Sequence, residues 1–372
     1  MSMTNTKIVG GRSAEFLNRI VSNQSDKRRA VNEALGRVLS AYLPTAYDDQ
    51  LMEQIDWLLD SMLLELGEQP GVAAAEGMVR GGRALVVTGE AGAGKSRALA
   101  HAFASRSEFE GFGKPGEWCP LLSVVAPSPF TLGALGNEIA RKLGYHGRRE
   151  IQHSKVWPVV RELMAECGIR ILHIDEAQHG DEIQSDSMTQ EVENTFKRMM
   201  QEADWPIWLI LSGLPELSRF CQADASMKRR VRVLPFEALT FDDHAGAVRQ
   251  TMRDLVALCP SVGCAQLQSE EFAHRLLHAA TYQFGIVVEY VQDAIAECLT
   301  VESGGELGLG HFADVYAIRT GMRNDDNLNP FLANDWTAVP VESALYEDVL
   351  DDTGKPTGAR KPKGRNTKGM RK

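Results

Sequence analysis

The segment that most constrains the fold is a glycine-rich stretch of eight residues. It reads Gly89-Glu90-Ala91-Gly92-Ala93-Gly94-Lys95-Ser96 and fits the pattern G-x-x-x-x-G-K-[ST]. An apolar run over 84–88 precedes it, and a helical pattern from Ser96 to about Ser105 follows it. Glycines let backbone N–H groups approach phosphate oxygens without a Cβ in the way, and a helix N-terminus adds partial positive charge. The stretch therefore predicts a strand, a phosphate-binding loop and a helix.

Two side chains carry the chemistry of this loop. Lys95 is expected to reach the β- and γ-phosphates of a nucleotide, and the Ser96 hydroxyl is expected to ligate Mg²⁺. We predict that the whole loop, together with the next residue, Arg97, binds the nucleotide.

A second motif follows 80 residues after Lys95, where the strand-like run 169–174 ends in Asp175-Glu176. Such a pair at a strand end can hold the Mg²⁺ shell through Asp175 and polarise the attacking water through Glu176. His173 interrupts the apolar run. We interpret it as a histidine whose ring is satisfied by neighbouring elements, the alternative being a catalytic group.

The next predicted strand, 207–211, ends at Ser212-Gly213. A polar residue at the end of this strand can lie between the two motifs and hold the water or the γ-phosphate. Ser212 is therefore either a sensor of this kind or an ordinary serine at a strand end.

Basic residues stand at the entrance to a final predicted strand, 231–236. Arg229 or Arg230 at a subunit edge could reach a neighbour's γ-phosphate and stabilise the charge that develops during transfer. The alternative is a solvated basic turn.

The order of these elements predicts an α/β protein with a mainly parallel sheet between helices. Apolar spacing predicts helices over 26–43, 48–66, 132–143, 154–167, 188–203, 240–258, 269–280, 285–299 and 310–320. We expect residues 1–25 to be polar and loosely held. The predicted organisation is an N-terminal helical region (1–68), a P-loop core (69–238), a strand-free helical lid (239–320) and a polar extension with a disordered basic tail (321–372).

Charge is unevenly distributed along the chain. The formal net charge is −10, yet eight of the 40 Lys and Arg residues lie within 353–372, where there is no acid. An acidic body with a basic tail does not indicate a nucleic-acid-binding surface over the whole domain, so any DNA contact must be local. No apolar run is long enough to span a membrane and no leader is visible, so we expect a cytoplasmic protein without a membrane partner.

The motif order over about residues 50–320 resembles that of an AAA+ P-loop ATPase. More narrowly, the chain is similar to the TniB and TnsC group of transposition regulators, which are related to ExeA-type secretion ATPases. The residues that carry this narrower resemblance are 172–179, Asn194, Lys197, 212–217 and Arg230.

The resemblance implies ATP as the nucleotide and homo-oligomers that form on double-stranded DNA, select a target site and recruit a transposase. Many AAA+ relatives place an arginine on the lid helix where this chain has Val288, which implies no direct lid contact with the γ-phosphate and slow turnover. Local DNA contacts could come from Arg148, Arg149 and Lys155, the alternative for each being an ordinary solvated charge. The basic tail could bind DNA, dock an acidic partner or only keep the chain end soluble. The alternative function is an ATPase that drives a protein machine without binding DNA.

Overall fold

The structure is a computed structural model that describes residues 3–67, 81–147, 149–177, 186–223, 225–301, 304–321 and 325–341. Several sequence expectations fall outside these residues: Arg148, the end of the resemblance run at Gln178 and His179, and the basic tail. The chain forms two compact units, of which one holds residues 42–239 and 283–285 and the other holds the remaining residues.

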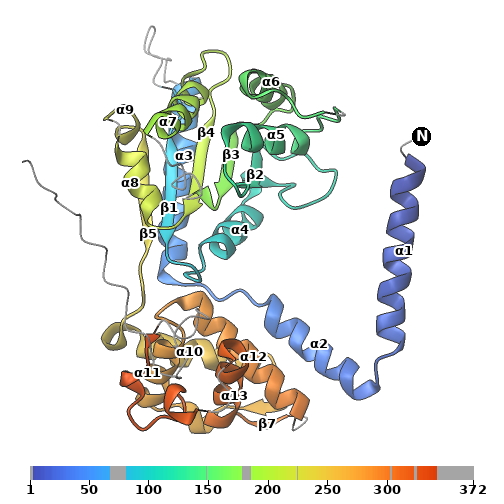
Figure 1. The fold of residues 1–372 in the computed structure, drawn as a ribbon, viewed down its shortest axis with the longest axis vertical. Helices are drawn as coiled ribbons and strands as arrows, with labels where there is room; N and C mark the ends of the chain where they lie inside the picture. Colours follow the sequence, from blue (N-terminus) through green and yellow to red (C-terminus); the bar gives the residue numbers. More distant parts are fainter. Residues whose placement is uncertain are drawn as a thin grey trace, which may run out of the picture. The chain divides into compact units, whose positions relative to one another are not determined.

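The core unit contains a five-stranded sheet in the order β2-β3-β4-β1-β5, in which every neighbouring pair is parallel (Figure 1). The strands are β1 (Ala84–Gly89), β2 (Leu121–Val125), β3 (Ile171–Asp175), β4 (Trp208–Gly213) and β5 (Val231–Phe236). The strands predicted over 84–88, 169–174, 207–211 and 231–236 are confirmed as β1, β3, β4 and β5. Their order places β4, with Ser212, between the strands that carry the two phosphate motifs.

Helices cover both faces of this sheet. As a result, every residue of β1 and β4 is buried, whichever face its side chain points to. One apolar cluster joins the sheet to α3 and α4, and a second joins it to α5, α6, α7 and α8. These elements are α3 (Ala46–Leu66), α4 (Lys95–Ser105), η1 (Ser107–Phe109), α5 (Leu132–Lys142), α6 (His153–Glu166), α7 (Asp186–Gln201), α8 (Glu216–Ala223) and α9 (Ala225–Lys228). The sequence predicted no helix where α8 and α9 form.

The second unit is mainly helical. Its elements are α1 (Met3–Ser22), α2 (Asp26–Ser40), α10 (Phe241–Ala257), η3 (Ala265–Leu267), α11 (Glu270–Ala279), α12 (Phe284–Val301), α13 (Leu309–Thr320), η4 (Asp326–Leu328) and η5 (Trp336–Ala338), and the first two residues of α12 count with the core unit. It also contains two short strands, β6 (Val262–Gly263) and β7 (Gly305–Glu306), which pair in parallel. The prediction of a strand-free region was therefore wrong, because strands of two residues are too short to show an apolar pattern.

The N-terminal helices α2 and α3 belong to different units. α2 belongs to the helical unit, where Gln292 Nε2 donates to the Val38 carbonyl oxygen at 3.0 Å, whereas α3 belongs to the core unit. Most of 1–25 forms α1, where we expected a loosely held segment; Phe16, Leu17, Ile20 and Val21 on this helix are exposed. Their spacing of four marks one helical face, which the polar composition of the segment obscured.

The described part of the C-terminal extension, 325–341, packs into the helical unit. Asn329 Nδ2 donates to the Ala313 carbonyl oxygen at 2.9 Å, and Arg275 Nη1 donates to the carbonyl oxygens of Pro330 and Ala333 at 2.8 and 2.9 Å. Val339 accepts from the buried ring of His278 at 2.8 Å. This part of the predicted polar extension is therefore held in place by hydrogen bonds from side chains to backbone carbonyl oxygens. Such hydrogen bonds leave no periodic pattern of apolar residues, so the sequence did not reveal them.

Candidate functional site

The phosphate loop follows β1 directly and leads into α4. Gly89 lies so close to β5 that a Cβ on it would stand 2.7 Å from the Phe236 carbonyl oxygen. Gly94 caps α4 with a left-handed φ of 96°, and no side chain caps the first turn of the helix. The loop therefore leaves backbone N–H groups of the helix N-terminus available to an anion, and Glu90, Ala91, Ser96 and Arg97 are exposed around it.

Lys95 begins α4 and turns its side chain back to the loop. Its Nζ donates to the carbonyl oxygens of Gly89 and Glu90 at 2.7 and 2.9 Å, and the residue is only 8% exposed. Burial lowers the pKa of this amine, while the carboxylates of Glu176, Asp175 and Glu90 act in the opposite direction. The ammonium group thus lies within the electrostatic reach of both acidic residues of the second motif.

Asp175, Glu176 and Ser212 come together at the carboxyl ends of β3 and β4. Ser212 Oγ donates to Asp175 Oδ1 at 2.5 Å, and the backbone N–H of Glu176 donates to the same oxygen at 3.0 Å. Glu176 itself has a left-handed φ of 55°, a conformation that costs a non-glycine residue roughly 1 kcal/mol. The sequence placed these three residues at neighbouring strand ends, and the structure joins them through one carboxylate oxygen.

The residues present are suited to Mg²⁺ held together with a nucleotide. A hydroxyl, Ser96, and a carboxylate, Asp175, are oxygen ligands of the kind that Mg²⁺ prefers. Within the described ranges, no cluster of three or more His, Cys, Asp or Glu residues could hold a metal by protein ligands alone. Phosphate oxygens and water would therefore supply most of the coordination, as is usual for Mg²⁺.

His173 is buried between neighbouring strands and both of its ring nitrogens have partners. Nδ1 lies 2.8 Å from Ser123 Oγ on β2, and Nε2 lies 2.9 Å from Ser212 Oγ on β4. Burial lowers the pKa of the ring to about 4, against the opposing effect of Asp175, and Lys142 lowers it further. The expectation of a histidine satisfied by its neighbours is met, but sequence reasoning missed that these neighbours lead to Ser212 and Asp175.

This pKa predicts a specific dependence of stability on pH. The ring takes up a proton near its ordinary value of 6.5 when unfolded and only near 4 when folded, so the unfolded state binds more protons between these values. The free energy of unfolding should therefore fall as the pH drops from about 6.5 to 4, by about 3 kcal/mol from this residue. Urea denaturation at several pH values should show a weaker fall for His173→Gln. Parallel curves for the two proteins would contradict the assignment.

The two candidate arginines lie at the opposite end of the sheet. β5 begins at Val231, which is paired with Ala84 at the start of β1, whereas the phosphate loop begins at the other end of β1. Arg229 is exposed, and its carbonyl oxygen accepts from Arg83 Nη1 at 3.3 Å. Arg230 is half-buried. Burial lowers the pKa of its guanidinium group most, the nearby charge of Arg83 lowers it further, and Glu65 acts in the opposite direction.

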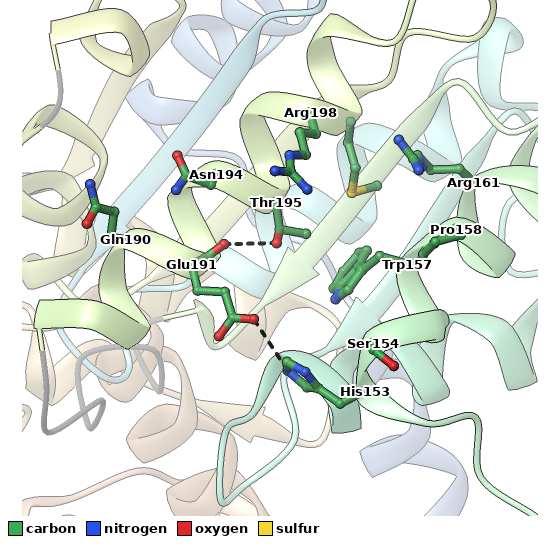
Figure 2. A pocket seen from close by; sticks show the side chains of 11 residues that line it. His153, Ser154, Trp157, Pro158, Arg161, Gln190, Glu191, Asn194, Thr195 and Arg198 are labelled. Carbon is green, nitrogen blue, oxygen red and sulfur yellow. Dashed lines mark hydrogen bonds and ion pairs between the residues drawn. The ribbon is translucent and has the colours of Figure 1, made fainter.

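A groove of about 460 Å³ is lined by residues of α6 and α7 (Figure 2). His153 Nε2 lies 3.8 Å from Glu191 Oε1 at one end, and Arg161 forms an ion pair with Glu202 at 2.5 Å. The indole nitrogen of Trp157 is buried there, and none of the residues that the structure describes is its hydrogen-bond partner. None of the lining residues belongs to the phosphate loop or to the ends of β3 and β4. The exposed Arg149 and Lys155 flank the first residue of α6, which is one of the groove's lining residues.

Comparison with known proteins shows what part of this chain is similar to. Residues 74–240 match the family model of the bacterial TniB protein. The fold is similar to that of the ORC1 protein of Aeropyrum pernix in complex with DNA, with 13% identity, a TM-score of 0.54 and coverage of 79% of this chain and 74% of that chain. Cdc6p of Pyrobaculum aerophilum is 17% identical with a TM-score of 0.49, covering 79% of this chain and 75% of that chain. None of the curated proteins matches.

The predicted fold class is confirmed: the core is an AAA+ P-loop ATPase fold, with a mainly helical region following it. The recognition of a TniB-type segment is confirmed as well. None of the helices in the described ranges is both long enough and apolar enough to cross a bilayer.

Proposed function

We propose that this protein is an ATP-dependent regulator of DNA transposition, because residues 74–240 match the family model of the bacterial TniB protein. It binds ATP, oligomerises on double-stranded DNA, selects the target and recruits the transposase, and hydrolysis of ATP dismantles the assembly. The family match carries the proposal, since its residues include the phosphate loop, Asp175, Glu176, Ser212 and both candidate arginines.

The residues of the core unit divide the work of hydrolysis. The loop amides from Gly89 to Ser96 and the Lys95 ammonium hold the phosphates, and Ser96 and Asp175 hold Mg²⁺. When bound, Mg²⁺ neutralises charge that develops on the phosphate oxygens. Glu176 accepts hydrogen bonds from the attacking water and orients it, and Ser212 fixes Asp175. An arginine of a neighbouring subunit completes the site, which couples hydrolysis to assembly.

The proposal is tested by ATPase rate and by sedimentation with ATP, with and without duplex DNA, at two salt concentrations. Lys95→Ala serves as the variant that lacks the phosphate-binding ammonium. DNA-stimulated turnover and large ATP-dependent complexes that salt dissolves would support the proposal. If DNA changes neither rate nor size in the wild type, the regulator role fails and the ATPase that drives a protein machine takes its place.

We place local DNA contacts on the exposed Arg149 and Lys155. Removing both charges in Arg149→Ala/Lys155→Ala should weaken DNA binding about equally for all sequences and reduce the slope of log affinity against log salt by about two. Fluorescence anisotropy with labelled duplex DNA at four salt concentrations measures this slope. Lys114→Ala is the matched control, because Lys114 is exposed but paired with Glu117 at 3.3 Å. An unchanged slope in the double variant would show that DNA binds elsewhere, for example at the basic tail.

A further inference from the structure

A chain of polar side chains, buried at its centre and half-buried at Ser123 and Asp175, crosses three neighbouring strands and ends at Asp175. Ser123 on β2, His173 on β3 and Ser212 on β4 are linked by contacts of 2.8 and 2.9 Å, and Ser212 bonds Asp175 at 2.5 Å. His173 is 4% exposed and Ser212 is fully buried. Each ring nitrogen and each hydroxyl in this chain has a protein partner, so no water is needed to satisfy it.

The contacts fix the direction of every proton in the chain. An ionised carboxylate only accepts, so the single proton of the Ser212 hydroxyl is committed to Asp175. The Ser212 oxygen must then accept from His173, which places the ring proton on Nε2. A neutral imidazole has one N–H group, so Nδ1 accepts from the Ser123 hydroxyl. All three hydrogen bonds therefore point toward Asp175.

The two carboxylate oxygens of Asp175 differ in their hydrogen bonds. Oδ1 accepts from both the Ser212 hydroxyl and the Glu176 backbone N–H. Oδ2 accepts no hydrogen bond from any residue that the structure describes. One oxygen is thus fixed by the protein and the other is left for an external ligand.

We propose that His173, supported by Ser123, is a positioning residue of the ATPase site, which holds the Ser212 hydroxyl on Asp175 Oδ1 and so keeps Oδ2 for the Mg²⁺ shell. This inference rests on the proposed ATPase function of the same site. His173 touches neither nucleotide nor metal in this role. It acts only through Ser212, in the way that outer-shell hydrogen bonds orient metal-binding carboxylates.

The packing around the His173 ring favours a positioning role over a purely structural role in the hydrophobic core. The imidazole and the ring of Phe103 on α4 form a T-shaped contact, with ring centroids 5.2 Å apart. An aliphatic side chain would fill the same space without needing two partners, whereas a buried imidazole is costly unless both nitrogens are satisfied. The two serines supply those partners from different strands.

Three substitutions at one position separate positioning from packing. His173→Gln can place an amide N–H near the position of Nε2 and so keep the donor to Ser212. His173→Asn places its amide near Nδ1 and keeps only the contact with Ser123, and His173→Leu keeps neither. Each variant is compared with the wild type for kcat and KM of ATP, Mg²⁺ dependence, and melting temperature. Binding of a fluorescent ATP analogue is measured with and without Mg²⁺.

We expect His173→Leu and His173→Asn to lower kcat and weaken the Mg²⁺ response by about 10- to 100-fold, the range found for lost outer-shell partners. Nucleotide binding without Mg²⁺ should be unchanged, and His173→Gln should restore most of the loss. If all three variants lose activity in proportion to melting temperature, or if His173→Leu keeps the wild-type Mg²⁺ response, His173 is structural and the inference fails.

The tautomer gives a test that needs no turnover. In histidine-labelled protein without nucleotide, ¹⁵N NMR should show His173 as the Nε2–H form, with its signal assigned by its loss in His173→Gln. An Nδ1–H form overturns the inference while leaving the proposed ATPase function intact. Conversely, a wild type that shows the Nε2–H form but neither binds nor hydrolyses ATP overturns the proposed function, and the role of His173 with it.

Discussion

Glu176→Gln should lower ATP turnover at least 100-fold while leaving the affinity for ATP close to that of the wild type, because removal of a general base typically costs 10²- to 10⁴-fold. The substitution keeps the side-chain length and the backbone N–H that bonds Asp175 Oδ1 at 3.0 Å. It replaces an accepting carboxylate oxygen with an amide that is a poor base. The left-handed backbone of Glu176 is available to glutamine at a similar cost, so the fold should persist.

The measurement is steady-state turnover together with binding of labelled ATP and sedimentation on duplex DNA. Because hydrolysis is proposed to end the assembled state, the variant should accumulate as large DNA-bound complexes that the wild type releases. Glu110→Gln, the same chemical change at an exposed carboxylate of the core unit, is the control. A drop in turnover of less than 10-fold would mean that Glu176 does not orient the attacking water.

The parts of the site that could be predicted from the sequence are those encoded by neighbours along the chain. The phosphate loop needs glycine where φ is positive or where another strand comes close, and Gly94 and Gly89 show these two requirements. The acidic pair and Ser212 were predictable because each lies at the carboxyl end of a parallel strand, and the carboxyl ends of such strands meet at one edge.

The rest depends on pairs that are far apart in sequence. Ser123 and His173 are 50 residues apart and His173 and Ser212 are 39 apart, so no local pattern marks their hydrogen bonds. The same holds for the different exposure of Arg229 and Arg230 and for the association of α2 with the helical unit. The order of the strands makes the hydrogen bonds of His173 with Ser123 and Ser212 possible, because β3 lies between β2 and β4.

We expect Arg229→Ala to lower ATP turnover by about 10³-fold or more, the effect of losing an arginine that stabilises the transition state from a neighbouring subunit. The position of this residue requires action between subunits. Val231 pairs with Ala84 and Phe236 with Gly89, so Arg229 precedes the far end of β5. At about 3.3 Å per residue, it lies roughly 20 Å from the phosphate loop of its own chain.

Arg229 and Arg230 differ in solvent exposure. Arg229 is exposed, and no described residue forms a hydrogen bond or ion pair with its guanidinium group. Arg230 lies against the start of β1, where a Cβ on Gly81 would stand 3.1 Å from its Nη1, and it is close to Glu65. Arg230→Ala should therefore lower the melting temperature more than Arg229→Ala does. Lys228→Ala removes an adjacent exposed cation and should leave turnover within twofold of the wild type.

Mixing two inactive variants tests action between subunits directly. In assemblies that contain both Arg229→Ala and Glu176→Gln, a complete site forms wherever an Arg229→Ala subunit, with its own Glu176, faces the intact arginine of a Glu176→Gln neighbour. With random equal mixing this holds for roughly one site in four, so turnover should recover to about a quarter of the wild-type value. Since neither variant is active alone, recovery can arise only from such shared sites. A mixture as inactive as its components would place Arg229 outside the neighbour's active site.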